Sequence, residues 1–221
     1  MTTDIRVRGQ ARDVRDPDRA VLTIVVHAEA RDWAEAHIIV ASAMTTLNSG
    51  IEALKTSHPD AILWAATGQA SQTSYQNKGI MRFTERVMME VAFKDFKPMS
   101  EWAFAATNET VQLRNIDWQL SPDVRDRVRD ELGKKAIEDA RARATTFATA
   151  AGLKIIGVAA LADPGLLPGV PNPGGGIEYR GAVLRGAMPI AAMAGADDHT
   201  IDLTPEPIET EAAVEAHFLA E

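Results

Sequence analysis

The chain has 221 residues, 46% hydrophobic content and a formal net charge of −8, which is enough for one large domain or two small ones with a core that offsets chain entropy. It contains no cysteine, which excludes disulfides, thiolate metal sites and cysteine nucleophiles. The amino terminus lacks the charged beginning and apolar run of a secretory signal, and no stretch approaches membrane-spanning length. We therefore expect no membrane span and a cytoplasmic protein, or a periplasmic or secreted one if an export signal was removed.

The negative charge lies at the carboxy-terminal end. No Lys or Arg follows Arg185, and the eight carboxylates beyond it account for the whole net charge: Asp197, Asp198, Asp202, Glu206, Glu209, Glu211, Glu215 and Glu221. Such an end repels phosphate backbones, and no basic stripe with interleaved aromatics occurs elsewhere, so we expect no nucleic-acid partner. A solubilising surface is favoured over an acidic docking tail in region 197–221.

Two strands are predicted first. Ile5, Val7 and Gly9 alternate with polar residues, which predicts a short strand with one wet face. Asp16-Pro17-Asp18 supplies turn chemistry. Residues 20–28 are apolar on one face and half polar on the other, so this strand is expected to be covered on both sides, by protein or by another subunit.

A long amphipathic helix is predicted next. Asp32 is a good N-cap, with Glu35 three residues later, and the helix should last until His58-Pro59. Its apolar stripe has spacings of three and four: Trp33, His37, Val40, Ala41, Met44, Leu47, Ile51 and Leu54. Because His37 falls on this stripe, we expect it to be packed and hydrogen-bonded rather than to act as a base.

The middle of the chain predicts a hairpin, a short helix and a further strand. Residues 62–67 form a strand, 68–79 are polar and turn-rich, and 80–93 alternate clearly, with Glu85 as the one exception. Pro98 suits the first turn of a helix that lasts to about Ala106. Residues 111–120 alternate again as a strand.

The strongest helix signal follows. Ser121 precedes Pro122, Gly152 suits a left-handed terminus, and the stripe between them is alanine-rich, which lets the helix approach a sheet closely. Residues 153–162 predict a strand, and 163–195 a mobile Gly/Pro-rich excursion. Residues 209–219 predict a last strand, at a sheet edge because prolines precede it. Together these elements indicate a single α+β domain over residues 1–221, with a mostly antiparallel or mixed sheet and two long amphipathic helices packed against it.

No pattern specifies a catalytic site. Asp197-Asp198-His199 with Asp202 is the most suggestive cation cluster, but it lacks the glycine spacing of hard-cation sites, and a surface loop is favoured. Gly174 to Gly176 precedes no Gly-Lys-Ser/Thr and no helix, which argues against a phosphate loop. Glu138-Asp139 lies on a charged helix face. The four tryptophans are expected to be core or interface anchors, and the clustered methionines core filling. We therefore predict no catalytic residue, no cofactor and no metal ligand.

Three segments in order carry a family resemblance. Asp16 to Ala20 precedes an apolar strand and an alanine-rich helix; Asn115 to Ser121 follows; and Lys135 to Ala144 leads into Ala151-Gly152-Leu153. Residues 5–163 resemble the SIMPL-domain family, which includes periplasmic immunogenic and oxidative-stress-defence proteins of bacteria. A weaker similarity extends to Thr204 to Glu209 and the final strand. Segments 67–75 and 145–147 depart from the family pattern, as does the missing export signal.

The resemblance implies an α+β subunit that assembles into oligomers, in a family without an established catalytic residue set. The leading hypothesis is a non-enzymatic, self-associating structural or binding protein with a stress-related role and a homo-oligomeric state. One alternative is a small-ligand carrier or enzyme with a pocket under the 163–195 loop. Another is a signalling adaptor that presents its acidic carboxy terminus to a basic partner.

Overall fold

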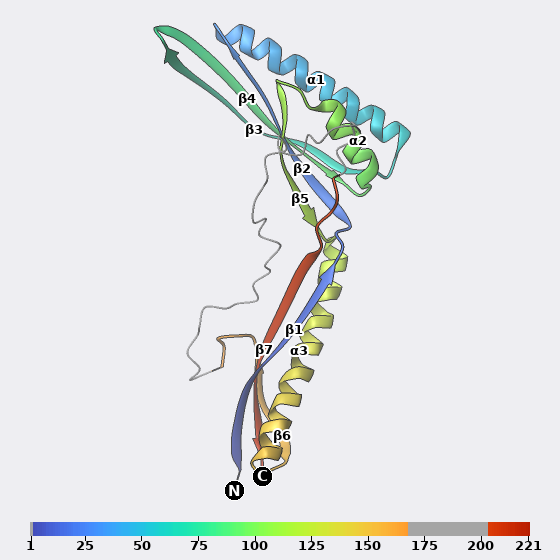
Figure 1. Cartoon of the computed structure of the whole chain (residues 1–221), viewed down its shortest axis with the longest axis vertical. Helices are drawn as coiled ribbons and strands as arrows, with labels where there is room; N and C mark the ends of the chain where they lie inside the picture. Colours follow the sequence, from blue (N-terminus) through green and yellow to red (C-terminus); the bar gives the residue numbers. More distant parts are fainter. Residues whose placement is uncertain (1, 168–202) are drawn as a thin grey trace, which may run out of the picture. The chain divides into compact units, whose positions relative to one another are not determined.

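The computed structural model describes residues 2–167 and 203–221, and the α+β prediction is confirmed within them. Figure 1 labels the elements. The elements follow the chain as β1 (Thr3–Arg15), β2 (Arg19–Ala30), α1 (Trp33–Ser57), β3 (Ile62–Asn77), β4 (Ile80–Phe93), α2 (Phe96–Ala106), β5 (Val111–Gln119), α3 (Pro122–Ala150), β6 (Ile155–Ala162) and β7 (Ile208–Ala220). None of the helices among these residues is long and apolar enough to cross a membrane.

The described chain divides into two compact units, each built from separated segments. We call residues 17–119 with 203–206 the four-stranded unit, and residues 2–16, 120–167 and 207–221 the three-stranded unit. Every strand pairing in both units is antiparallel. That the chain folds as a single domain, as the sequence predicts, stays a prediction.

In the four-stranded unit, the strand order is β3-β4-β2-β5, with α1 and α2 packed against one face. The central strand β2 is buried on that face, where Leu22 and Val26 are fully covered. Its other face is half-buried, and Val25 is 6% exposed there. Cover by protein on both faces is therefore observed in part, and cover by another subunit stays a prediction.

Local chemistry fixes the two helices of this unit. The Asp32 side chain accepts a hydrogen bond from the Glu35 N–H at 2.8 Å, as the capping pattern predicts, and α1 ends just before His58. Asp95 caps α2 through the Lys97 N–H at 3.2 Å, and Pro98 is the third helical residue, within the first turn as predicted. Both ends of α1, and the place of Pro98 in the first turn of α2, are thus predicted correctly.

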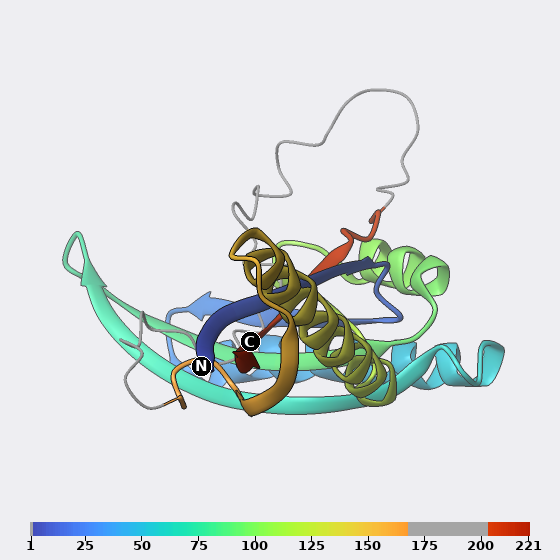
Figure 2. The same ribbon diagram turned by 90° about the horizontal axis from the view of Figure 1, so that it is seen from below.

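The β3–β4 hairpin corrects one prediction. Residues 68–77, expected to be turn-rich, continue β3 as a strand, and only Lys78 and Gly79 turn, with φ values of 49° and 81°. Positive φ at both central residues is what a tight two-residue hairpin requires. Figure 2 shows β3 and β4 as two long, curved strands joined at one end by this turn.

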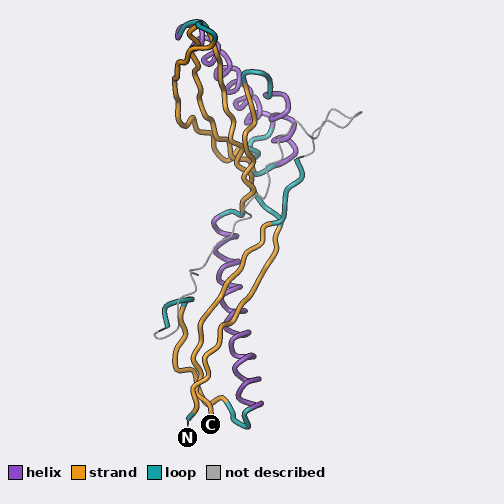
Figure 3. The backbone as a smooth tube through the Cα atoms, turned by 60° about the vertical axis from the view of Figure 1, so that its left-hand side comes forward, coloured by secondary structure: helices purple, strands orange, loops and turns teal. Residues whose placement is uncertain are grey.

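In the three-stranded unit, the strand order is β1-β7-β6, and α3 packs on β1 and β7 (Figure 3). A buried alanine stripe on α3 meets Ile5, Val7 and Phe218. Gly9 allows this close contact, because a Cβ added there would overlap the Ala136 carbonyl oxygen and the Ala140 nitrogen. The predicted close approach of an alanine-rich helix is therefore confirmed.

The carboxy-terminal end of α3 agrees with the prediction, whereas the position of β7 in its sheet does not. Ser121 precedes the helix without a side-chain capping bond, and Gly152 has φ of 75°, as predicted for its terminus. The final strand was expected at an edge and is instead central, between β1 and β6. Its prolines, Pro205 and Pro207, lie before the strand begins and so remove none of its ladder hydrogen bonds.

Candidate functional site

The free edge of β3 is the feature of the four-stranded unit that has no structural partner within the described residues. β3 ends the strand order, so one side of its backbone pairs with β4 and the other pairs with no described strand. All sixteen of its residues except Ile62 are exposed. The strand contains no charged residue and no proline, although charges and prolines are the usual means by which proteins block sheet edges.

The other edge strands differ from β3. The opposite edge of the same sheet, β5, is nine residues long and carries Arg114 and Asp117. In the three-stranded unit, β1 carries four arginines, and β6 is uncharged but only eight residues long, with two register shifts. β3 has its own shifts near Ile62 and Thr67, but pairs regularly from Ala70 to Asn77. This regular stretch is the longest uncharged strand template that the described chain offers.

On the helix side of the sheet, a polar cluster fixes β3 to its neighbours, and we call it the helix-side clamp: His37, Gln72 and Glu85. Glu85 on β4 is only 5% exposed. Its carboxylate lies 3.0 Å from Nδ1 of His37 on α1 and accepts a hydrogen bond from Nε2 of Gln72 on β3, also at 3.0 Å. A buried carboxylate needs such partners, so the clamp ties three elements together.

The helix-side clamp revises the prediction for His37. The residue is hydrogen-bonded as expected, but its side chain is 66% exposed rather than packed in the apolar stripe. The buried positions of this stretch of helix are Ala36 and Val40. His37 therefore supports Glu85 from the solvent side.

On the opposite face, a second cluster fixes the same part of β3, and we call it the open-side clamp: Glu29, Tyr75 and Arg82. The Tyr75 hydroxyl donates to Oε2 of Glu29 at 2.5 Å, and Nε of Arg82 lies 3.5 Å from Oε1 of the same carboxylate. The hydrogen bond to the Glu29 carboxylate, with smaller effects of desolvation and of the negative charge, raises the pKa of Tyr75 above its ordinary value. β3 is thus held on both faces around Gln72 to Tyr75 while its edge stays free.

Aromatic and apolar side chains surround this part of the hairpin. Trp33 of α1 packs edge-on against Phe83 of β4, with ring centroids 5.0 Å apart. Near the turn, the exposed side chains include Ile80 and Met81. Large apolar groups beside a free edge are typical of protein interfaces rather than of isolated surfaces.

The residues that the sequence singled out for chemistry lie elsewhere. Asp197, Asp198, His199, Asp202 and the triglycine 174–176 lie outside the described residues, as does most of the 163–195 excursion. Asp139 accepts a hydrogen bond from the Gln10 N–H at 2.9 Å. Glu209 and Glu211 each pair with Arg12 at 2.7 Å. Among residues 2–167 and 203–221, no three His, Cys, Asp or Glu side chains come close enough to hold a metal ion.

The tryptophans and methionines fit their predictions in part. Trp102 is buried and Trp118 packs against the core, whereas Trp33 and Trp64 are partly exposed. Met89 fills the core, but Met81 is exposed. Of the clamps, only Glu85 left a signal in the sequence, as the one polar residue that interrupts the buried face of its strand.

Comparison with known proteins gives one finding that spans both units. The model of the SIMPL family, described as a protein of unknown function (DUF541), matches residues 5–218. No curated protein matches the chain in sequence. The match takes in every strand and helix described above, apart from the first two residues of β1 and the last two of β7.

Proposed function

Since the chain belongs to the SIMPL family, whose description gives no function, we propose that it is a non-enzymatic, self-associating structural or binding protein that assembles through the free edge of β3. The observation that carries the proposal is the edge itself, an exposed sixteen-residue strand without charge or proline. An edge of this kind templates pairing with another strand. The partner with an identical, uncharged edge is a second copy of the chain.

The two clamps support this proposal. A strand that must pair in a fixed register is most useful when its shape is set before pairing, because less ordering entropy is then lost on association. The helix-side and open-side clamps hold Gln72 and Tyr75 from opposite faces. Antiparallel pairing of two such strands about a two-fold axis gives a closed, isologous contact.

We assign no catalytic role to the polar groups of this site. The buried carboxylate of Glu85 is engaged by His37 and Gln72, and that of Glu29 by Tyr75 and Arg82. These contacts explain both clusters as groups that stabilise the hairpin. The description of the matching family names no activity that would assign these groups another role.

The test introduces like charges at the edge. In Thr73→Lys/Ser74→Lys, both positions are exposed on β3, and a symmetric contact places each new charge near its copies, which opposes pairing. We expect the wild-type chain to elute as a multiple of 23.9 kDa in size exclusion with light scattering, and the variant to move toward the monomer at the same concentration.

The matched control places the same substitutions on an exposed helix face. Ser42→Lys/Thr56→Lys changes the net charge equally at two exposed positions of α1 and should leave the assembly unchanged. A wild-type chain that is a clean monomer at micromolar concentration contradicts the proposal. So does a β3 variant that stays as assembled as the wild type.

A further inference from the structure

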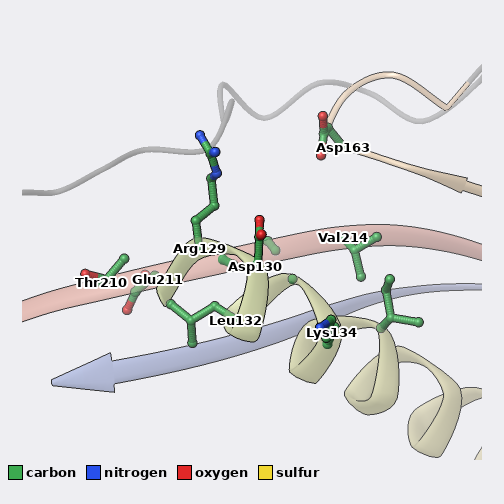
Figure 4. A pocket seen from close by; sticks show the side chains of 12 residues that line it. Arg129, Asp130, Leu132, Lys134, Asp163, Thr210, Glu211 and Val214 are labelled. Carbon is green, nitrogen blue, oxygen red and sulfur yellow. The ribbon is translucent and has the colours of Figure 1, made fainter. Parts of the chain in front are cut away.

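A groove in the three-stranded unit has the features of a small-molecule site. It lies between α3 and β7 and has a cavity volume of about 410 Å³, and Asp163, which follows β6, also lines it (Figure 4). Leu132, Ile137 and Val214 give it an apolar floor. Its size falls within the range of pockets that hold small ligands.

The groove lies beside the part of β7 that β6 does not reach, because the last register pair of these two strands is Ala162 with Glu215. Leu161 and Val158 on β6 are register partners of Ala216 and Phe218, which α3 buries. Yet Leu161 is 47% and Val158 55% exposed, since α3 packs on β1 and β7 and hardly reaches β6. Gly133 widens the opening, because a Cβ at that position would meet nothing within 4 Å.

The charges of the groove divide into satisfied and unsatisfied groups. Arg129 pairs with Asp126 at 3.3 Å and Glu211 with Arg12 at 2.7 Å. Within the described part of the chain, the side chains of Asp130, Lys134 and Asp163 make no hydrogen bond or ion pair. Two free carboxylates against one ammonium leave the rim net negative.

A hydroxyl group also lines the groove. Thr210 lines the same cavity, is only 8% exposed, and its hydroxyl has no hydrogen-bond partner among residues 2–167 and 203–221. A ligand with a polar head would give this hydroxyl a hydrogen-bond partner. Figure 4 shows Asp130 on α3 and Asp163 on the segment that follows β6.

We propose that this groove binds a small organic cation, a primary amine on an apolar body, with the ammonium between Asp130 and Asp163 and the body on Ile137 and Val214. A carboxylate is the complementary partner for an ammonium and makes a charge-assisted hydrogen bond with it. An anion of the same size would meet the two carboxylates and be repelled. This inference concerns a different unit from the β3 edge and does not depend on assembly.

The test titrates the full chain with n-hexylamine at neutral pH and follows backbone amide shifts by NMR. We expect saturable shifts at Gly133, Thr210 and Val214 with hexylamine, and none with hexanoate, which has the same apolar body, at equal concentration. Asp130→Asn/Asp163→Asn should weaken hexylamine binding by about tenfold or more. Glu138→Gln, an exposed α3 position outside the groove, should leave it unchanged.

A second variant separates loss of the site from loss of the fold. Gly133→Leu fills the groove from a position with free space, and leucine is a better helix former than glycine. It should therefore abolish hexylamine binding while the Tm stays equal or rises. The proposal is overturned if hexanoate binds as well as hexylamine, if the double Asn variant keeps wild-type affinity, or if Gly133→Leu still binds.

Discussion

Two carboxylates, Glu29 and Glu85, accept hydrogen bonds that fix β3 to its neighbours. Glu29 is exposed. It accepts the Tyr75 hydroxyl at 2.5 Å, with Arg82 3.5 Å away. Glu85 is the contrasting case, because it is buried and depends on His37 and Gln72 for its hydrogen bonds. The first contact is therefore sensitive to solvent conditions, while the second is part of the packing.

The open-side clamp predicts a pH dependence at Tyr75. Its folded-state pKa is raised above 10.0 because the hydroxyl donates to the Glu29 carboxylate. A raised pKa means that the contact contributes fully below pH 10.0 and is lost as the pH rises through the folded-state value. Glu29→Gln removes the carboxylate and should bring the pKa of Tyr75 down toward 10.0.

The measurement is an absorbance titration of tyrosinate. The chain has a second tyrosine, Tyr179, so the curve of Tyr75→Phe is subtracted to isolate Tyr75. Asp117→Asn, an exposed carboxylate on the other edge strand, is the control and should leave the Tyr75 curve in place. An unchanged pKa in Glu29→Gln would show that the carboxylate does not cause the shift.

At the scale of elements, the hairpin is stiffened by contacts that join three strands and a helix. Removing the buried carboxylate in Glu85→Ala breaks the bonds to His37 and Gln72. Hydrogen bonds to charged groups contribute about 1.5–3 kcal/mol each, so we expect the local opening free energy of residues 70–77 to fall by about 1–3 kcal/mol. Hydrogen exchange of these backbone amides is the measurement.

The control for this prediction lies on the same strand. Glu90 is exposed on β4, and Glu90→Ala should leave exchange in residues 70–77 unchanged. Equal protection of β3 in wild type and Glu85→Ala would mean that backbone pairing with β4 alone holds the strand.

Burial explains which elements the sequence predicted. The apolar alternation of β4 and the alanine stripe of α3 exist because one face of each is packed, so periodicity located both. Residues 68–77 are exposed on both faces, have no reason to alternate in polarity, and were therefore mistaken for turns. β7 was placed at an edge because Pro205 and Pro207 precede it, and its pairing with two strands far away in sequence leaves no local signal.

Only single residues of the candidate sites could be predicted, because the residues that form each site lie far apart in the sequence. Glu85 interrupted a clear pattern, but its partners His37 and Gln72 lie 48 and 13 residues away in sequence. The α3 groove depends on how far β6 extends along β7, which the sequence of α3 alone does not specify. Asp130 and Asp163 accordingly gave no sign of lying in one cavity.

At the scale of the whole molecule, the central question is whether the two units fold together. The chain crosses between them near Asp16, Gln119 and Glu206, so each unit is completed by segments distant in sequence. The family match, residues 5–218, takes in both. This interleaving favours a single cooperative domain over two independent ones.

The tryptophans give a direct test, because Trp33, Trp64, Trp102 and Trp118 all belong to the four-stranded unit. Tryptophan fluorescence therefore reports that unit, while far-ultraviolet circular dichroism reports both. Gly9→Ala destabilises the three-stranded unit, since its methyl group would overlap the α3 backbone, at a cost of about 1–3 kcal/mol. In a single domain, this variant lowers the midpoints of both signals equally.

Independent units give a different result for the same variant. The fluorescence midpoint would then stay at its wild-type value while the circular dichroism curve splits into two transitions. Gly157→Ala, at a β6 position where an added Cβ meets nothing within 4 Å, controls for the glycine substitution itself and should shift neither signal appreciably. Protein concentration is held constant throughout, because assembly through β3 would couple the midpoint to concentration. Coincident shifts in Gly9→Ala thus require that the packing of α3 on β1 and the fold of the four-stranded unit, which holds the tryptophans, share one free energy of unfolding.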